Sequence, residues 1–217
     1  MKKMLSLFLA LCLMLGAVPA LGEAAPAEEA PAAGIPAAGD LIEGFEVKEI
    51  RDFPVYGAQL VYFEHQQTGA KVLWIANDDT NRGFVMSFPT RPSDDTGLPH
   101  VFEHATMFGS EKYPSSSLFF GLSYQTYNTF MNAQTADAMT QYPVASLSEE
   151  QLLALADYYV DSCFHPMIMT DEDIFRTQAW HYNLPDMDSE LTYEGVVYSE
   201  VSGLMTLEEM ALEHATT

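Results

Sequence analysis

Apolar and polar positions alternate over several stretches of the chain and predict a strand-rich core. Two β-rich runs, Gln59–His65 and Lys71–Ala76, are joined by Gln-Gln-Thr-Gly and predict a hairpin. A third run covers Gly83–Pro89. Two further strands are predicted at Thr129–Thr135 and Ala138–Ala145, on either side of an Ala-Asp turn.

Helical spacing replaces this alternation after Ser148, which is predicted to cap the helix that follows. The predicted buried stripe consists of Leu152, Leu155, Ala156, Tyr159, Val160 and Cys163. A His-Pro pair ends the helix, so His165 is interpreted as a cap or surface residue and not as a metal ligand. Residues 178–184 predict one more strand, which carries Trp180 and His181.

The stretch 97–110 contains the strongest candidate chemistry. If it is helical, His100, Glu103 and His104 lie on one face, with Pro99 in the first turn and Gly109 at the end. Two imidazoles four residues apart can supply half of a tetrahedral zinc shell, and the carboxylate can act as general base toward a water molecule. This order of residues is the inverted zincin motif. The competing interpretation is a surface helix with two unrelated histidines.

A third ligand is sought in the segment 193–205. If this segment is helical, the one-turn neighbours of Glu200 are apolar, so its carboxylate is expected on the inward face, where it would need a cation. Glu208 has equally apolar neighbours, and spacing alone does not choose between the two acids. For Glu208 the alternative is a residue near the chain end in a frayed helix.

The first residues resemble an export signal. Two lysines precede an apolar run of about fifteen residues that closes with small residues, which predicts a signal peptide at 1–22 and an exported protein. An uncleaved anchor is the alternative, although the run is shorter than the ~20 residues of a membrane span. Residues 23–44 are rich in Ala, Pro and Glu and are expected to form a tether. Cys163 would then be the only cysteine of the mature chain, so no intrachain disulfide is expected.

The 217 residues allow one domain or slightly more, and the composition, 48% hydrophobic, is sufficient for a packed core. Lys and Arg number 9 against 31 Asp and Glu, a formal net charge of −22. Such a surface repels nucleic acid and anionic lipid, so neither is expected as a partner. It would favour cationic peptides or serve solubility alone.

Three ordered segments carry a family resemblance. His-Val-Phe-Glu-His at 100–104, followed by Gly-Ser-Glu-Lys-Tyr-Pro at 109–114, resembles the active-site segment of the pitrilysin and insulinase family of zinc metallopeptidases. It is most similar to the presequence-protease and falcilysin branch. Residues 132–146 resemble that branch's strand pair beside the metal, and residues 195–201 resemble the segment that brings its third ligand. The similarity runs from about Phe45 to Met205.

The resemblance implies roles for individual residues. His100, His104 and Glu200 would bind Zn²⁺, and Glu103 would be the base. The edge strand that receives an extended peptide would carry Asn132 and Ala133, and Asn132 could also steady the scissile carbonyl. The alternative for Asn132 is a turn or strand-end amide, and Tyr142 is either a substrate-binding or a packing residue, with packing favoured.

Several features depart from the family pattern. Gln178 stands where the branch usually has an acid, and Ser199 and Ser202 replace an Asn and a Lys of the third-ligand segment. Family members consist of two similar halves of two domains each. The present chain would end before the first domain is complete, so a fragment that lacks the C-terminal half is expected.

The resulting expectation is an α+β fold with a mixed, mostly antiparallel sheet and helices on one face, formed by residues 45–217 as an incomplete first domain. The expected function is an exported zinc endopeptidase of unfolded peptides, without stable membrane insertion after signal cleavage. Two alternatives stay open. One is a non-catalytic peptide-binding or assembly subunit, and the other is a truncated product without stable structure.

Overall fold

The computed structural model describes residues 34–204. The predicted signal peptide, half of the predicted tether and Glu208 lie outside these residues. The chain divides into two compact units, one reaching to Thr80 and the other starting at Asn81.

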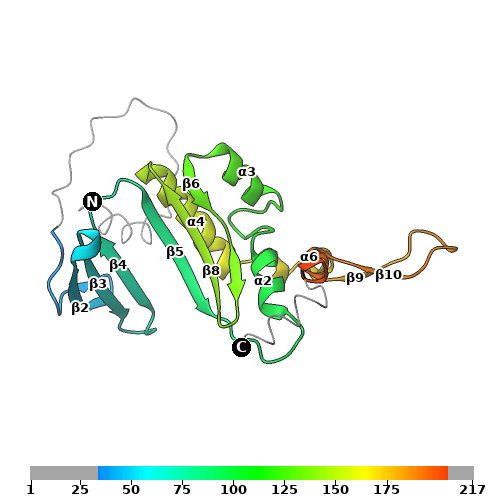
Figure 1. Cartoon of the computed structure of the whole chain (residues 1–217), viewed down its shortest axis with the longest axis horizontal. Helices are drawn as coiled ribbons and strands as arrows, with labels where there is room; N and C mark the ends of the chain where they lie inside the picture. The colour runs from blue at the N-terminus through cyan, green and yellow to red at the C-terminus, as the bar shows by residue number, and fades with distance from the viewer. Residues whose placement is uncertain (1–33, 205–217) are drawn as a thin grey trace. The chain divides into compact units, whose positions relative to one another are not determined.

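The first unit is an antiparallel sheet of four strands that follow one another in chain order (Figure 1). Its strands are β1 (Leu41–Ile42), β2 (Phe45–Phe53), β3 (Ala58–His65) and β4 (Lys71–Ala76), with the 3-10 turn η2 (Pro54–Tyr56) between β2 and β3. The predicted hairpin is confirmed, because β3 and β4 pair in antiparallel fashion, with Glu64 opposite Lys71 and Gln59 opposite Ala76. Residues 41–42, which were assigned to the tether, pair with β2 instead.

Strand β2 was not expected from the sequence. Its register against β3 shifts between Val47 and Glu49, and this irregularity interrupts the period of two on which a strand prediction depends. The buried residues Val47, Val61 and Phe63 nevertheless join β2 to β3 and form the core of this unit.

The second unit contains a sheet in which β8 (Met139–Ser146) is central (Figure 1). Strand β5 (Arg82–Pro89) pairs with one side of β8, and β6 (Asn128–Met131) and β7 (Gln134–Ala136) pair with it as well. The single strand predicted at 129–135 is thus divided into β6 and β7. Every strand pair that the structure describes is antiparallel.

Helix α4 (Glu149–Phe164) packs on this sheet against β8 and β5. The predicted cap is confirmed, since the Gln151 amide donates to Ser148 Oγ at 3.3 Å. Four members of the predicted stripe are buried: Leu152, Leu155, Ala156 and Tyr159. Val160 was placed wrongly, because it is 39% exposed, and Cys163 is half-buried. The buried face of the helix also includes Leu153, Tyr158 and Ser162, which the prediction did not contain.

The remaining elements of the second unit are short. They are α2 (Leu98–Thr106), α3 (Leu118–Gln125), the 3-10 turn η3 (Met167–Met169), α5 (Glu172–Gln178), the hairpin β9 (His181–Asn183) and β10 (Thr192–Glu194), and α6 (Val196–Leu204). The strand predicted at 178–184 is shorter than expected, because Gln178 still belongs to α5. The predicted α+β class is confirmed. Within residues 34–204, no helix has the length and apolar character that a membrane crossing requires.

Candidate metal centre

The motif segment forms helix α2, as predicted, but the helix ends at Thr106 and not at Gly109. Gly97 precedes it in the left-handed region, with φ 67°, and the amides of His100 and Val101 both donate to the Gly97 carbonyl. A residue with a side chain is strained in this backbone conformation, which explains the glycine. Pro99 lies in the first turn, where its missing amide hydrogen costs nothing. Val101, Ala105 and Thr106 are buried and attach the helix to its surroundings.

The side chains of His100, His104 and Glu200 converge, although Glu200 lies far away in the sequence. His100 Nε2 is 3.5 Å from Glu200 Oε2, and His104 Nε2 is 3.3 Å from the same oxygen. One ligand atom from each of the three residues lies within 4.8 Å of the others. The two histidines come from α2 and the glutamate from α6.

The separations of 3.5 and 3.3 Å between the imidazole nitrogens and the Glu200 oxygen are close to those expected around a tetrahedral zinc ion. Bonds of about 2.0–2.1 Å to nitrogen and oxygen place neighbouring ligand atoms about 3.3–3.4 Å apart. A direct ion pair between imidazolium and carboxylate would be shorter, at about 2.7–2.9 Å. Two imidazoles and one carboxylate also form a donor set that zinc accepts, with a fourth position left open.

The burial predicted for Glu200 is wrong. The Glu200 side chain is 45% exposed. In helix α6 Val197 is buried, whereas Val196 and Val201 are 38% and 40% exposed. The apolar neighbours in the sequence therefore do not enclose the carboxylate, which meets the two histidines at the surface of the unit.

A close backbone approach brings α6 to this position. Gly195 immediately precedes the helix, and a Cβ atom there would lie 2.2 Å from the Ala179 carbonyl oxygen. The Tyr198 amide donates to the same oxygen at 3.4 Å. Val101, Ala179 and Val197 form a small buried cluster that joins α2 to α6. Gly195 thus permits the contact that places Glu200.

The candidate base Glu103 is only 6% exposed, although Phe102 just before it is 39% exposed. Thr135 in β7 donates a hydrogen bond from Oγ1 to Glu103 Oε2 at 2.8 Å. Among the described residues, Oε1 of Glu103 accepts no hydrogen bond. Sequence reasoning did not single out Thr135, because a threonine in a strand carries no signal of its distant partner.

Asn132 and Ala133 lie at the break between β6 and β7, on the edge of the sheet. The Asn132 amide donates to the Pro143 carbonyl at 3.1 Å, and the Asn132 carbonyl accepts from the Tyr159 hydroxyl at 2.7 Å. The Asn132 side chain is exposed and Ala133 is half-buried. In the described part of the chain, no strand pairs with the outer side of β6 or β7. The edge is therefore open at the predicted substrate residues.

Tyr142 belongs to the core. It is 4% exposed, and its hydroxyl lies 3.2 Å from Thr106 Oγ1. Burial raises the pKa of the Tyr142 hydroxyl well above its ordinary value. Its burial and its contact with Thr106 support the packing role that the sequence favours, and a contact with substrate stays a prediction.

Gln178 is fully buried at the end of α5, where the family pattern has an acid. Neither its side-chain nitrogen nor its side-chain oxygen has a hydrogen-bond partner within residues 34–204. Ser199 and Ser202, the other two departures, are exposed on α6, where Ser202 Oγ donates to the Ser199 carbonyl at 3.3 Å.

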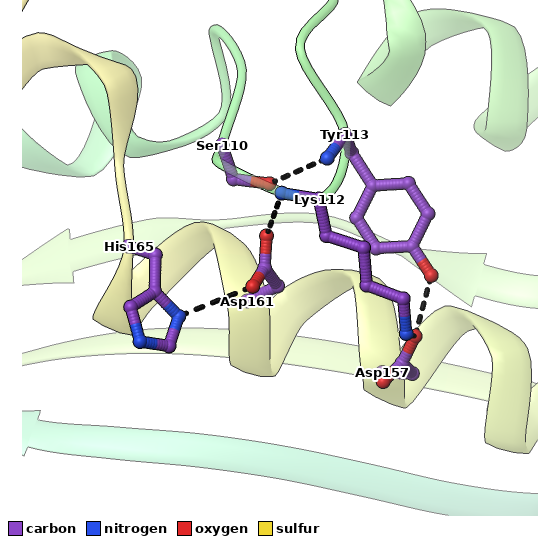
Figure 2. Close-up of polar contacts among 6 residues, drawn as sticks. All are labelled: Ser110, Lys112, Tyr113, Asp157, Asp161 and His165. Atoms are coloured by element: carbon purple, nitrogen blue, oxygen red, sulfur yellow. Dashed lines mark hydrogen bonds and ion pairs between the residues drawn. The ribbon is translucent and has the colours of Figure 1, made fainter. Parts of the chain in front are cut away.

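The loop that follows α2 is fastened to α4 by a polar network (Figure 2). The Lys112 amide donates to Asp161 Oδ2 at 2.9 Å, and His165 Nδ1 lies 3.1 Å from Asp161 Oδ1. The Lys112 ammonium and the Tyr113 hydroxyl both meet Asp157 Oδ2. His165 is the predicted cap residue at the end of α4. The sequence signal for this network is the spacing of 157, 161 and 165, which places the three residues one helical turn apart.

The network shifts the acidity of its members. Burial would raise the pKa of Asp161, but hydrogen bonds from Ser110, the Lys112 amide and His165 outweigh it, so the pKa is lowered. Burial, together with the neighbouring Asp157, raises the pKa of Tyr113 to about 12. Asp161 is therefore held as a carboxylate, and the Tyr113 hydroxyl stays a donor at neutral pH.

Comparison with known proteins places the chain in a family. No family model matches it. It is 37% identical to Protein HypA of Clostridium perfringens, in an alignment that covers 76% of this chain and 17% of that protein. It is 38% identical to Presequence protease 1, chloroplastic/mitochondrial, of Arabidopsis thaliana, over 68% of this chain and 14% of that protein. The mitochondrial presequence protease of Saccharomyces cerevisiae is 36% identical, with coverage of 76% and 17%.

A solved structure gives the same fold. The crystal structure of pitrilysin aligns with 60% of this chain and 14% of its own, with a TM-score of 0.51 and 21% sequence identity. The chain spans only about one-sixth of the length of the curated relatives it matches. By its sequence similarity to presequence proteases, the chain belongs to the pitrilysin and insulinase family and corresponds to the N-terminal portion of such a protein.

Proposed function

We propose that this chain carries the metal-binding and general-base residues of a zinc-dependent endopeptidase that acts on unfolded peptides. The observation that carries the proposal is the convergence of His100, His104 and Glu200, with nitrogen-to-oxygen separations of 3.5 and 3.3 Å, beside the buried carboxylate of Glu103. The relatives named presequence proteases support a peptidase activity.

His100 and His104 would bind the metal through Nε2, and Glu200 would bind it through Oε2. Zinc in such a site supplies Lewis acidity, which polarises a carbonyl group and lowers the pKa of a water molecule toward about 7. The histidines must be neutral to act as ligands, so metal affinity is expected to fall in acid. Together the three residues would supply three ligands to the metal.

Glu103 would act as the general base. Its Oε2 is occupied by the Thr135 hydroxyl, whereas Oε1 is free to accept a proton from the attacking water. The same carboxyl group would then pass the proton to the amine that leaves when the peptide bond breaks. Because Glu103 lies one residue before His104 on the same helix, the base and the ligands are held in one rigid element.

The substrate would bind as an added strand. Strands β6 and β7 present an open edge at Asn132 and Ala133, and Thr135 of β7 touches Glu103. Backbone hydrogen bonds along such an edge are independent of the peptide sequence but require an extended chain. The need for an extended chain would explain a preference for unfolded peptides. Because the relatives are much longer, we also propose that further polypeptide helps to hold the substrate.

The test is Glu103→Gln, which keeps the size of the side chain and removes the base. Cleavage of an unstructured fluorogenic peptide is expected to fall about 10²–10⁴-fold, while about one zinc per chain is retained. Glu190→Gln, an exposed acid in the loop between β9 and β10, is the matched control and should leave both properties unchanged. Equal cleavage by Glu103→Gln and the unmodified protein would refute the proposal. Absence of both bound zinc and cleavage would instead favour the non-catalytic peptide-binding or assembly subunit.

We further propose that the protein is exported. The support is the basic start and apolar run at residues 1–22, which lie outside the described part of the structure. The amino-terminal sequence of the protein recovered outside the cytoplasm should begin near residue 23. Recovery of the full chain, starting at Met1, only from the cytoplasm would contradict export.

A further inference from the structure

Three threonine hydroxyls form a row that ends at the candidate base. Thr90 Oγ1 is 2.7 Å from Thr140 Oγ1, and Thr140 Oγ1 is 3.2 Å from Thr135 Oγ1. Thr135 Oγ1 lies 2.8 Å from Glu103 Oε2. Thr140 is 2% exposed and Glu103 is 6% exposed, whereas Thr90 and Thr135 are half-buried.

The register of the sheet produces this row. Thr135 in β7 and Thr140 in β8 are direct cross-strand partners, so their side chains share one face of the sheet. Thr90 follows β5 on the other side of β8, and its amide donates to the Ala138 carbonyl at 3.2 Å. Strands β7 and β8 and the residue after β5 thus contribute one hydroxyl each. Helix α2 places Glu103 within hydrogen-bond distance of Thr135.

Counting donors fixes the direction of the row. A hydroxyl has one proton to donate and can accept as well, whereas an ionised carboxylate only accepts. Thr135 must therefore give its proton to Glu103 and accept one from Thr140. Thr140 has then used its own proton and must accept from Thr90. Each bond in such a chain polarises the next, which strengthens the bond to the carboxylate.

We propose that Thr135 is the positioning residue of the general base, with Thr140 and Thr90 fixing the direction in which its hydroxyl points. The inference rests on the proposed function of Glu103. The bond to Oε2 holds the carboxylate in one rotamer and leaves Oε1 as the oxygen that takes the proton. Thr135 itself touches no reacting atom and acts only through Glu103.

The kinetic test compares Thr135→Val, which removes the hydroxyl and keeps the shape, with Thr135→Ser, which keeps the hydroxyl. Peptide cleavage by Thr135→Val should show a kcat about 10–100-fold lower, with KM and zinc content within about twofold of the unmodified protein. Thr135→Ser should retain kcat within about threefold. A residue that only shaped the substrate edge would change KM, and serine would not rescue it.

A second readout needs neither activity nor metal. In protein treated with a chelator, Thr135→Val should unfold at a lower temperature than Thr135→Ser, because the buried carboxylate loses its donor. In a Glu103→Ala background this difference should become smaller, because no carboxylate is left to hold and only the bond with Thr140 is still lost. If Thr135→Val does not yield folded protein, Thr135→Ala replaces it with the same expectations.

The outcomes separate the two proposals. If Glu103→Gln cleaves normally, the proposed function fails, and the unfolding measurements still show whether Thr135 holds Glu103. If Glu103→Gln is inactive but Thr135→Val and Thr135→Ser have equal kcat, the inference about Thr135 is overturned and the proposed function stands. A difference in unfolding temperature that is just as large in the Glu103→Ala background would also overturn it.

Discussion

Helices α2 and α6 both contribute to the candidate metal centre, but they are held in very different ways. Glu103, Val101, Ala105 and Thr106 of α2 are buried. Helix α6 buries Val197, whereas the side chain of its candidate ligand Glu200 is 45% exposed. The candidate base is therefore buried and the two histidines beside it are half-buried on a well-packed helix, while the third candidate ligand stands on a helix with few contacts of its own.

The segment after α2 strengthens this difference. The Tyr158 hydroxyl donates to the Met107 carbonyl at 3.3 Å, just after the helix ends. The following loop pairs with the end of α4, where Ser110 and Pro166 form an isolated bridge. Asp157 and Asp161 then fasten Lys112 and Tyr113 to α4 (Figure 2). Helix α4 thus anchors the segment that follows α2, and the strands β7 and β8 contact α2 itself.

This comparison suggests that metal binding and the placement of α6 depend on each other. A ligand that binds only the assembled site stabilises that arrangement by mass action. The two histidines need no such help, because α2 is fixed without them. Changes near α6 should consequently act mainly on metal affinity, and changes near α2 mainly on the stability of the whole unit.

The largest effect is expected from Gly195→Ala. Its Cβ would lie 2.2 Å from the Ala179 carbonyl oxygen, so α6 must move away and take Glu200 with it. Zinc affinity, measured by competition with a chromogenic chelator, should fall about 10–100-fold, as it does when the support of a ligand is removed. Gly203→Ala in the same helix is the matched control, because a Cβ there meets no atom within 4 Å. Equal affinities of the two variants would contradict the role of Gly195.

Asp161→Ala should act on stability instead. The change leaves the Lys112 amide and Ser110 without their acceptor, and the free energy of unfolding should fall by about 1–3 kcal/mol. Denaturant unfolding of the metal-free protein measures this directly. Asp95→Ala, at an exposed position before α2, should change stability by less than about 0.5 kcal/mol. A similar loss in both variants would show that the network does not anchor the loop.

The effect of Asp161 should depend on pH. Its pKa is lowered in the folded protein, so the folded state favours the carboxylate, and this contribution to stability is complete above the unfolded pKa of about 3.9. It is lost as the pH falls through the lowered folded pKa. The stability difference between Asp161→Ala and the unmodified protein should therefore be constant near pH 6 and shrink below about pH 4. A difference that grows in acid would contradict the assignment.

The smallest effect is expected at Gln178, in the helix that packs against both α2 and α6. The buried side-chain amide of Gln178 has no hydrogen-bond partner in the described part of the chain. Gln178→Met keeps the length of the side chain and removes both polar atoms, so thermal unfolding should show a gain of up to about 1 kcal/mol. Thr177→Val, at an exposed neighbouring position, serves as the control. A loss of stability in Gln178→Met would show that the amide has a partner after all.

Local patterns were sufficient for much of the fold. The hairpin of β3 and β4, the cap of α4 and helix α2 all follow from short-range spacing, because their hydrogen bonds join residues close in sequence. Strand β2 was missed because of its bulge, and the break between β6 and β7 was missed because it is defined by pairing with β8. Such pairings depend on residues far away in the chain.

The sequence by itself determined that His100, Glu103 and His104 share one helix, because the helical repeat fixes their spacing whatever surrounds them. Only the tertiary structure decided that Glu200 meets these histidines from an exposed helix, that Tyr142 packs in the core, and that Thr135 holds Glu103. Each of these contacts joins elements separated by many residues. Their geometry depends on how the sheet and the helices pack, which no local pattern encodes.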